Sequence, residues 1–150
     1  MRSDKSKLTV PAIHDRLFPH REFPPFIALE AVNRQVDDVV HRARDSPLDL
    51  DRLQAILIDV AERLVEAAQG NLSLSRWYRR LAVSMRLCHE AKQVLIGYAR
   101  VDILTTAEAQ SLSDGIGRVI DRLNEAIARA DLPDEVREAM PPFASSGEPR

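Results

Sequence analysis

Four arginines beside two aromatic residues are the part of this sequence best suited to binding chemistry. The group consists of Arg76, Arg79, Arg80 and Arg86, with Trp77 and Tyr78 among them. Guanidinium groups neutralise phosphates and aromatic rings stack on bases, so this run predicts a nucleic-acid-binding surface. In a structural alternative, both aromatic residues belong to the core. The arginines are then solvated, or paired with acids of the preceding helix such as Asp59 and Glu62.

The histidines and glutamates show no metal-binding pattern. Histidine occurs in four separate segments, without a Glu-x-x-His pair, at His14, His20, His41 and His89. Di-metal helical bundles use such pairs together with glutamates that point inward. The inward faces expected here are aliphatic, and four glutamates fall off them: Glu62, Glu66, Glu90 and Glu125. We therefore expect neither a metal nor another cofactor.

Catalytic signatures are also missing from the sequence. Gly115 and Gly117 lie inside a helical pattern with no strand before them and no lysine in place, so they do not form a phosphate cradle. Each costs the helix about 1 kcal/mol relative to alanine, which suggests that a neighbouring backbone comes close; simple tolerance is the alternative. Cys88, the single cysteine, falls on an apolar helix face and predicts a small core residue. We expect a protein that is not an enzyme.

Length and charge limit the class of protein. The 150 residues suit one domain with one core. With 21 basic and 23 acidic residues the net charge is −2, so any binding to nucleic acid must come from a local patch. No stretch approaches about 18 uninterrupted apolar residues, and no apolar run follows the first residues. We expect no membrane contact and a soluble, cytoplasmic protein.

Apolar residues recur at helical spacing in four segments. These are residues 25–44, 48–69, 74–104 and about 105–130. Because the connections are short, consecutive helices should be antiparallel, and the predicted fold is all-α, an antiparallel up-down four-helix bundle. We expect an N-terminal arm at 1–24, the bundle at 25–131 and a mobile C-terminal tail at 132–150. Short helical turns are predicted near 9–11 and 135–140.

Boundary signals agree with these segments. They are Pro47, Gly70, Ser73 or Ser75, and Thr105 or Thr106 with Glu108 as in a capping box. The last helix then has one clean apolar face, whose central residues should be buried: Leu112, Ile116, Val119 and Leu123.

The segment 74–104 is apolar on two sides of a helix. One side carries Leu74, Trp77, Tyr78, Leu81, Met85, Cys88, Leu95, Ile96 and Ala99. The other carries Val83, Leu87, Val94, Tyr98 and Val101. A helix apolar on two faces is usually buried on both, and a contiguous exposed apolar patch is typical of an interface. We predict that the second line is the interface of a homo-oligomer; the alternative is a central helix in a larger core.

Four motifs resemble a known family over roughly residues 48–128. They are Trp77-Tyr78-Arg79-Arg80-Leu81-Ala82-Val83-Ser84-Met85-Arg86-Leu87, the turn Ile103-Leu104-Thr105-Thr106, the run Gly115-Ile116-Gly117-Arg118-Val119-Ile120, and the helix end at 65–71. With these motifs the chain resembles the four-helix-bundle proteins that include the accessory variability determinants of diversity-generating retroelements and the proteins encoded in ribosomal-RNA intervening sequences. The Ile116-Gly117-Arg118 step is the most specific element.

This resemblance implies an assembly and partners. It implies a ring-shaped homopentamer that associates with a reverse transcriptase and with RNA or DNA through a basic surface. The four arginines named above are the candidate residues for that surface. Two other classes stay open. One is a protein-protein adaptor without nucleic-acid binding, which the charge favours. The other is a cofactor-holding bundle enzyme, which the aliphatic inward faces disfavour.

Overall fold

Helices make up the fold, as the apolar spacing predicts. The computed structural model describes residues 19–42 and 45–130. Along the chain it has the 3-10 helix η2 (Pro19–Glu22) and the helices α2 (Pro24–Val40), α3 (Asp51–Ala68), α4 (Leu74–Arg100) and α5 (Thr106–Arg129). These residues contain no strand, so the all-α prediction is confirmed. Most of the predicted arm, the turns near 9–11 and 135–140, and the tail lie outside the described residues.

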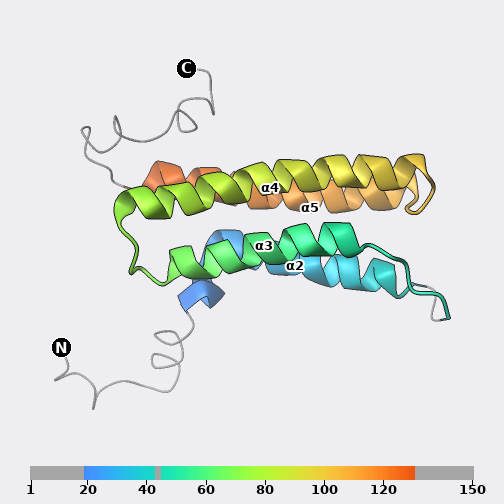
Figure 1. Ribbon diagram of the computed structural model, residues 1–150, viewed down its shortest axis with the longest axis horizontal. Helices are drawn as coiled ribbons and strands as arrows, with labels where there is room; N and C mark the ends of the chain where they lie inside the picture. Colours follow the sequence, from blue (N-terminus) through green and yellow to red (C-terminus); the bar gives the residue numbers. More distant parts are fainter. Residues whose placement is uncertain (1–18, 43–44, 131–150) are drawn as a thin grey trace, which may run out of the picture.

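The four long helices stand side by side and antiparallel. α3 packs on α4, α4 on α5 and α5 on α2, while α2 and α3 complete the square through a smaller contact. Figure 1 shows α4 in front of α5 and α3 in front of α2, with the start of α2 and the end of α5 at the same end of the bundle. η2 packs on α2 and α3. The predicted up-down four-helix bundle is confirmed.

Aliphatic side chains from all four helices fill one core. The predicted inward face of α5 is buried, with Leu112, Ile116, Val119 and Leu123 fully enclosed. They share a single cluster with Leu29 of α2, Leu57 of α3 and Leu81 of α4. Burying each such side chain stabilises the fold by about 1.5 to 3 kcal/mol, so the packed faces and not helix propensity hold the bundle together.

The first connection differs from the prediction at both ends. α2 ends at Val40 instead of residue 44, and His41 follows as the C-cap with a backbone outside helical values (φ −101°, ψ 16°). The Leu48 N–H donates to the Val40 carbonyl at 3.0 Å, so the chain turns back at once. α3 starts at Asp51 instead of residue 48. The reason is Leu50, which the non-helical approach buries completely in the core.

α4 begins where predicted but ends early. Ser73 is the N-cap, and its side chain accepts a hydrogen bond from the Arg76 N–H at 3.3 Å. The helix ends at Arg100, and Asp102 adopts a φ of 63° in the turn, a conformation that is unfavourable for most side chains but tolerated by aspartate. The predicted extension to residue 104 is therefore wrong. Leu104 lies beyond the helix and is buried there.

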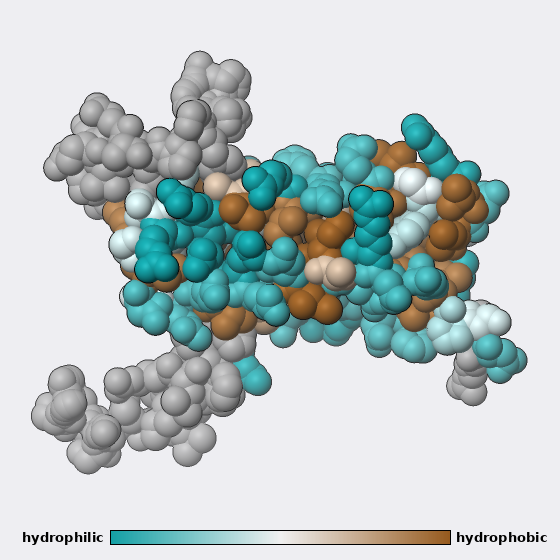
Figure 2. All heavy atoms as spheres, viewed as in Figure 1, coloured by the Kyte–Doolittle hydropathy of each residue, from teal (hydrophilic) through white to brown (hydrophobic). Residues whose placement is uncertain are grey.

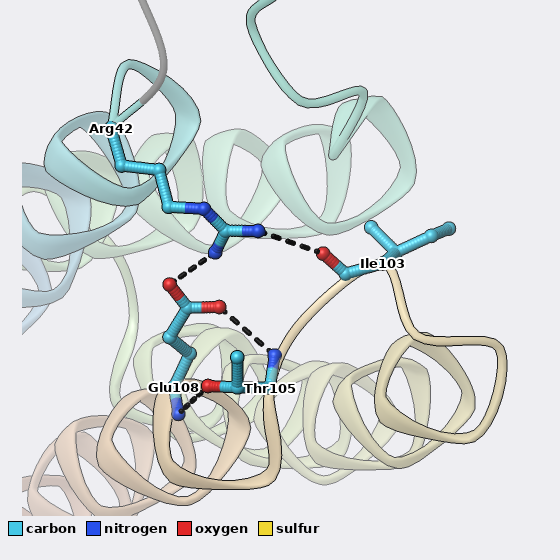
Figure 3. Close-up of polar contacts among 4 residues, drawn as sticks. All are labelled: Arg42, Ile103, Thr105 and Glu108. Atoms are coloured by element: carbon cyan, nitrogen blue, oxygen red, sulfur yellow. Dashed lines mark hydrogen bonds and ion pairs between the residues drawn. The ribbon is translucent and has the colours of Figure 1, made fainter.

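A capping box fixes the start of α5 and ties it to the end of α2 (Figure 3). The Thr105 hydroxyl accepts from the Glu108 N–H at 3.0 Å, and the Glu108 carboxylate accepts from the Thr105 N–H at 2.9 Å. Arg42 pairs with the same carboxylate and donates to the Ile103 carbonyl at 3.5 Å. The hydrogen bond from Arg42 holds the pKa of Glu108 below its ordinary value. The predicted capping box is confirmed.

Candidate binding surfaces

The four arginines of the predicted nucleic-acid surface do not share one environment. Arg76, Arg79 and Arg86 are exposed on α4, and none forms an ion pair within the part of the chain that the structure describes. Arg80 is half-buried, and its Nε lies 2.7 Å from Oε1 of Glu66 on α3. Three of the four charges are therefore open to a ligand, and the fourth is paired with an acid of α3.

The acids expected to neutralise this run act only in part. Asp59 pairs with Arg63 on its own helix, and Glu62 is exposed without an ion pair among residues 19–42 and 45–130. The acid that reaches α4 is Glu66, one turn further along α3 than Glu62. The structural alternative, in which the arginines are solvated or paired, thus fits all four: Arg80 is paired, with Glu66, and the other three are exposed.

The two aromatic residues of the run are part of the fold. Tyr78 is 0% exposed and clusters with Trp77, Ile127 and Ala130. Its ring cannot stack on a base, so that part of the prediction is wrong for Tyr78. Trp77 is half-buried and lines a recess of about 300 Å³ together with Phe23 of the segment before α2.

The exposed arginines form a convex surface. At about 100° per residue, Arg76, Arg79 and Arg86 fan over about 80° of the outer side of α4 and over about 15 Å of its length. Side chains spread in this way reach phosphates along a backbone and do not enclose a single base. The geometry therefore suits charge neutralisation more than sequence readout.

The second apolar line of α4 lies on the side that faces α3. Its helical members are half-buried: Val83, Leu87, Val94 and Tyr98. The Tyr98 hydroxyl accepts a hydrogen bond at 3.2 Å from the Leu53 N–H, a first-turn donor that α3 itself leaves without a partner. Val101 is the C-cap and is 65% exposed. Figure 2 shows hydrophobic patches along the middle of the face made by α3 and α4. Because its helical members are half-buried, the line is used within the chain and also remains partly exposed.

The groups considered for catalysis and metal binding lie apart. Burial raises the pKa of the Cys88 thiol to about 12, although Lys92 opposes this shift, so the group is not a thiolate at neutral pH. Among the described residues, no three His, Cys, Asp or Glu side chains are placed to share a metal ion. Glutamates 62, 66, 90 and 125 are exposed, off the inward faces. None of the helices described is long and apolar enough to cross a membrane.

A groove of about 420 Å³ lies on the outer side of the α2–α5 contact. It is lined by Pro24, Ile27, Ala28, Ala31, Val32 and Arg34 of α2 and by Gly115, Arg118 and Arg122 of α5. Reading along the sequence does not reveal this groove, because its two walls are more than 80 residues apart in the chain. The signal that was present is a pair of facing small-residue positions, Ala28 and Ala31 on one helix and Gly115 on the other, with arginines at helical spacing beside them.

Gly115 forms part of the groove floor because α2 comes close to α5 there. A methyl group at Gly115 would lie 3.0 Å from Cγ2 of Val32 and 3.4 Å from Oε1 of Gln35. At Gly117 the nearest atom would be Nζ of Lys92, at 3.3 Å. The close neighbours are side chains in both cases, so the expectation of a neighbouring backbone was wrong. The close approach itself is real at Gly115.

Comparisons with known proteins leave the resemblance untested. A scan against protein-family models, a search of curated proteins and a search of solved structures each returned no match.

Proposed function

We propose that this protein is a non-enzymatic helical scaffold that binds nucleic acid through the outer surface of α4. The observation that carries the proposal is the exposure of Arg76, Arg79 and Arg86 without ion pairs among the described residues. Each of these charges can neutralise a phosphate and release a condensed counterion. Binding of this kind fixes the position of a nucleic-acid backbone and depends weakly on base sequence.

The motifs at 77–87 and 115–120 support a narrower form of the proposal. In that form the chain acts as an accessory protein of a diversity-generating retroelement and associates with a reverse transcriptase. The protein is then a homo-oligomer, and a pentamer is the form we propose. A ring repeats its three exposed arginines in every subunit, so a positive belt can form although the net charge of one chain is −2.

The half-buried line on α4 supports the oligomer. Val83, Leu87 and Val94 keep part of their surface exposed along one side of the helix, where a second subunit can cover them. Leu87→Glu combined with Val94→Glu should give monomers, measured by light scattering on a size-exclusion column, with circular dichroism to check that the variant is folded. A wild-type protein that is monomeric at tens of micromolar, about the range in which a specific interface persists, would remove the ring.

A protein-protein adaptor without nucleic-acid binding is the second candidate. It is favoured by the net charge of −2 and by the ion pair that neutralises Arg80. Under this function the arginines of α4 are solvated charges that keep the surface hydrophilic.

Fluorescence anisotropy with labelled RNA and DNA separates the two candidates. We expect the wild type to bind at low salt and to lose affinity steeply as salt rises. Changing Arg76, Arg79 and Arg86 together to Gln should weaken binding at least tenfold and reduce the salt slope by about 2 to 3 units. Arg100→Gln, an exposed position at the other end of α4, is the matched control and should change little. If the affinity for RNA and DNA changes neither with salt nor with the three substitutions, or if no binding occurs at low salt, the adaptor is the better-supported function.

A further inference from the structure

The contact between α2 and α5 is sealed along one half and open along the other. At the end near the α4–α5 turn, Arg42 pairs with Glu108 and Gln35 donates a hydrogen bond to Ser111. Val32 then fills the space above Gly115. Beyond this point α2 carries alanine at positions 28 and 31, and the groove of about 420 Å³ opens there. The small side chains of Ala28 and Ala31 leave this part of the seam open.

The groove combines an apolar floor with a positively charged rim. Arg34 stands on the α2 wall, and Arg118 and Arg122 stand on the α5 wall. The recess of about 300 Å³ that is also lined by Pro24 and Arg122 adds Arg129 and one acid, Glu125, which pairs with Arg122 at 2.8 Å. The residues that line the two cavities thus include four arginines and one carboxylate, in a chain whose net charge is −2. This excess of positive charge favours a ligand that carries negative charge.

We propose that the α2–α5 groove is a docking site for an acidic amphipathic helix of a partner protein. This inference is independent of nucleic-acid binding at α4. The apolar stripe of the partner helix lies over Ile27, Ala28 and Ala31, because a stripe at helical spacing matches a groove that runs between two helices. Carboxylates on either side of that stripe meet Arg34 on one wall and Arg118 on the other.

The form of the groove favours a helix over other ligands. Both walls are α-helices whose backbone groups are hydrogen-bonded internally, so an added strand finds no free sheet edge. The groove is open to solvent along the seam, whereas small-molecule sites enclose most of their ligand. Phosphate groups of a nucleic acid gain from the arginines but nothing from the apolar floor. Only an acidic and apolar chain uses both features.

Anisotropy with three labelled synthetic peptides tests the site. Each peptide is as long as the 17 residues of α2. One has a leucine stripe flanked by glutamates, the second has the same stripe flanked by lysines, and the third keeps the glutamates but replaces the leucines with glutamine. We expect binding of the first peptide alone, in about the micromolar range.

Substitutions in the groove and on α4 then assign the binding surface. Arg34→Glu with Arg118→Glu should weaken binding of the acidic amphipathic peptide at least tenfold. Ala31→Trp, at an exposed position on the groove wall, should do the same by filling the space without disturbing the core. Arg76→Glu with Arg79→Glu on α4 is the matched charge-reversal control and should leave peptide binding unchanged. Circular dichroism establishes that each variant is folded.

The outcomes are distinct. Any of three results would overturn the proposal. The lysine peptide could bind as tightly as the acidic amphipathic peptide, the acidic amphipathic peptide could fail to bind, or its affinity could be the same for the wild type and both groove variants. Sedimentation velocity covers a further case: if the acidic peptide dissociates a self-associated wild type, the groove belongs to a second copy of this chain and not to another protein. RNA binding measured on the same variants reports on α4 separately, so failure of one proposal is distinguishable from failure of the other.

Discussion

Two regions of the bundle carry exposed arginines, and they differ in shape. On α4, Arg76, Arg79 and Arg86 project from one convex helix surface. At the α2–α5 seam, Arg34 and Arg118 stand on opposite walls of an apolar groove. A run on one helix is visible in the sequence, whereas a groove needs two helices to be brought together. The difference shows that local charge density and a shaped binding site are separate properties, and that only the first can be found by reading along the chain.

The largest expected effect comes from the core that supports the groove. Leu123→Ala removes a fully buried side chain of α5 and should lower the free energy of unfolding by about 2 to 5 kcal/mol. Because α5 forms one wall of the groove, this variant should weaken peptide binding at the groove more than RNA binding at the arginines of α4. Chemical denaturation gives the stability change. A variant that melts within about a degree of the wild type would mean that the inward face of α5 is misplaced.

A pair of glycine substitutions tests the close approach that forms the groove floor. Gly97 on α4 is exposed with nothing within 4 Å of an added methyl group, so Gly97→Ala should stabilise the protein by about 0.5 to 1 kcal/mol through helix propensity. Gly115→Ala has the same gain, but its methyl group meets Val32, whose β-branched side chain is buried and stiff.

We therefore expect the Gly115→Ala protein to be less stable than the Gly97→Ala protein by about 1 to 3 kcal/mol. Equal stability of the two variants in denaturant titrations would show that α2 moves away freely at Gly115. The groove would then be less well defined than the seam geometry indicates.

The sealed half of the α2–α5 seam should respond to pH. Glu108→Gln keeps the capping geometry but loses the ion pair with Arg42, and should cost about 1 kcal/mol at neutral pH. The pKa of Glu108 is lowered in the folded protein, so the unfolded state binds the proton more readily. The stabilisation is therefore fully present above the ordinary value of 4.5 and is lost as the pH falls through the lower folded-state pKa.

Unfolding curves of the wild type and the Glu108→Gln variant should accordingly differ at neutral pH and converge in acid. A constant difference between the two proteins at every pH would exclude the ion pair as its source.

The smallest effect concerns Arg80 on α4, which pairs with Glu66. Glu66→Gln removes the partner of Arg80 and should change stability by less than about 1 kcal/mol, because the pair is partly exposed. It should also free a fourth positive charge, so RNA affinity should rise several-fold and the salt slope should steepen by about one unit. Glu62→Gln, which removes an exposed acid of the same helix with no ion pair in the described part of the chain, is the control. If both variants bind RNA equally, Arg80 has no part in the surface.

Much of the fold could be predicted because its signals are local. The spacing of Leu112, Ile116 and Leu123 predicts a helix with one buried face, and all three are fully enclosed. Thr105 and Glu108 predict the start of α5 because a capping box involves only residues three apart. Gly70, with a φ of 76°, occupies the turn after α3 as its sequence position indicates. The start of α3 at Asp51 and the end of α4 at Arg100 were missed because the backbone beside each of these helices depends on where Leu50 and Leu104 find space in the core.

What the sequence by itself determined is which residues are helical, which face of each helix is apolar, and that four arginines lie close together on α4. Tertiary structure alone decided which charges are available. It placed Glu66 beside Arg80 and left Arg76 without an acid among the described residues, and it brought Arg34 opposite Arg118 across the seam. The physical reason is the distance along the chain over which each kind of interaction acts. Helix periodicity and capping act over three or four residues, whereas ion pairs and grooves depend on contacts between helices that are far apart in the chain.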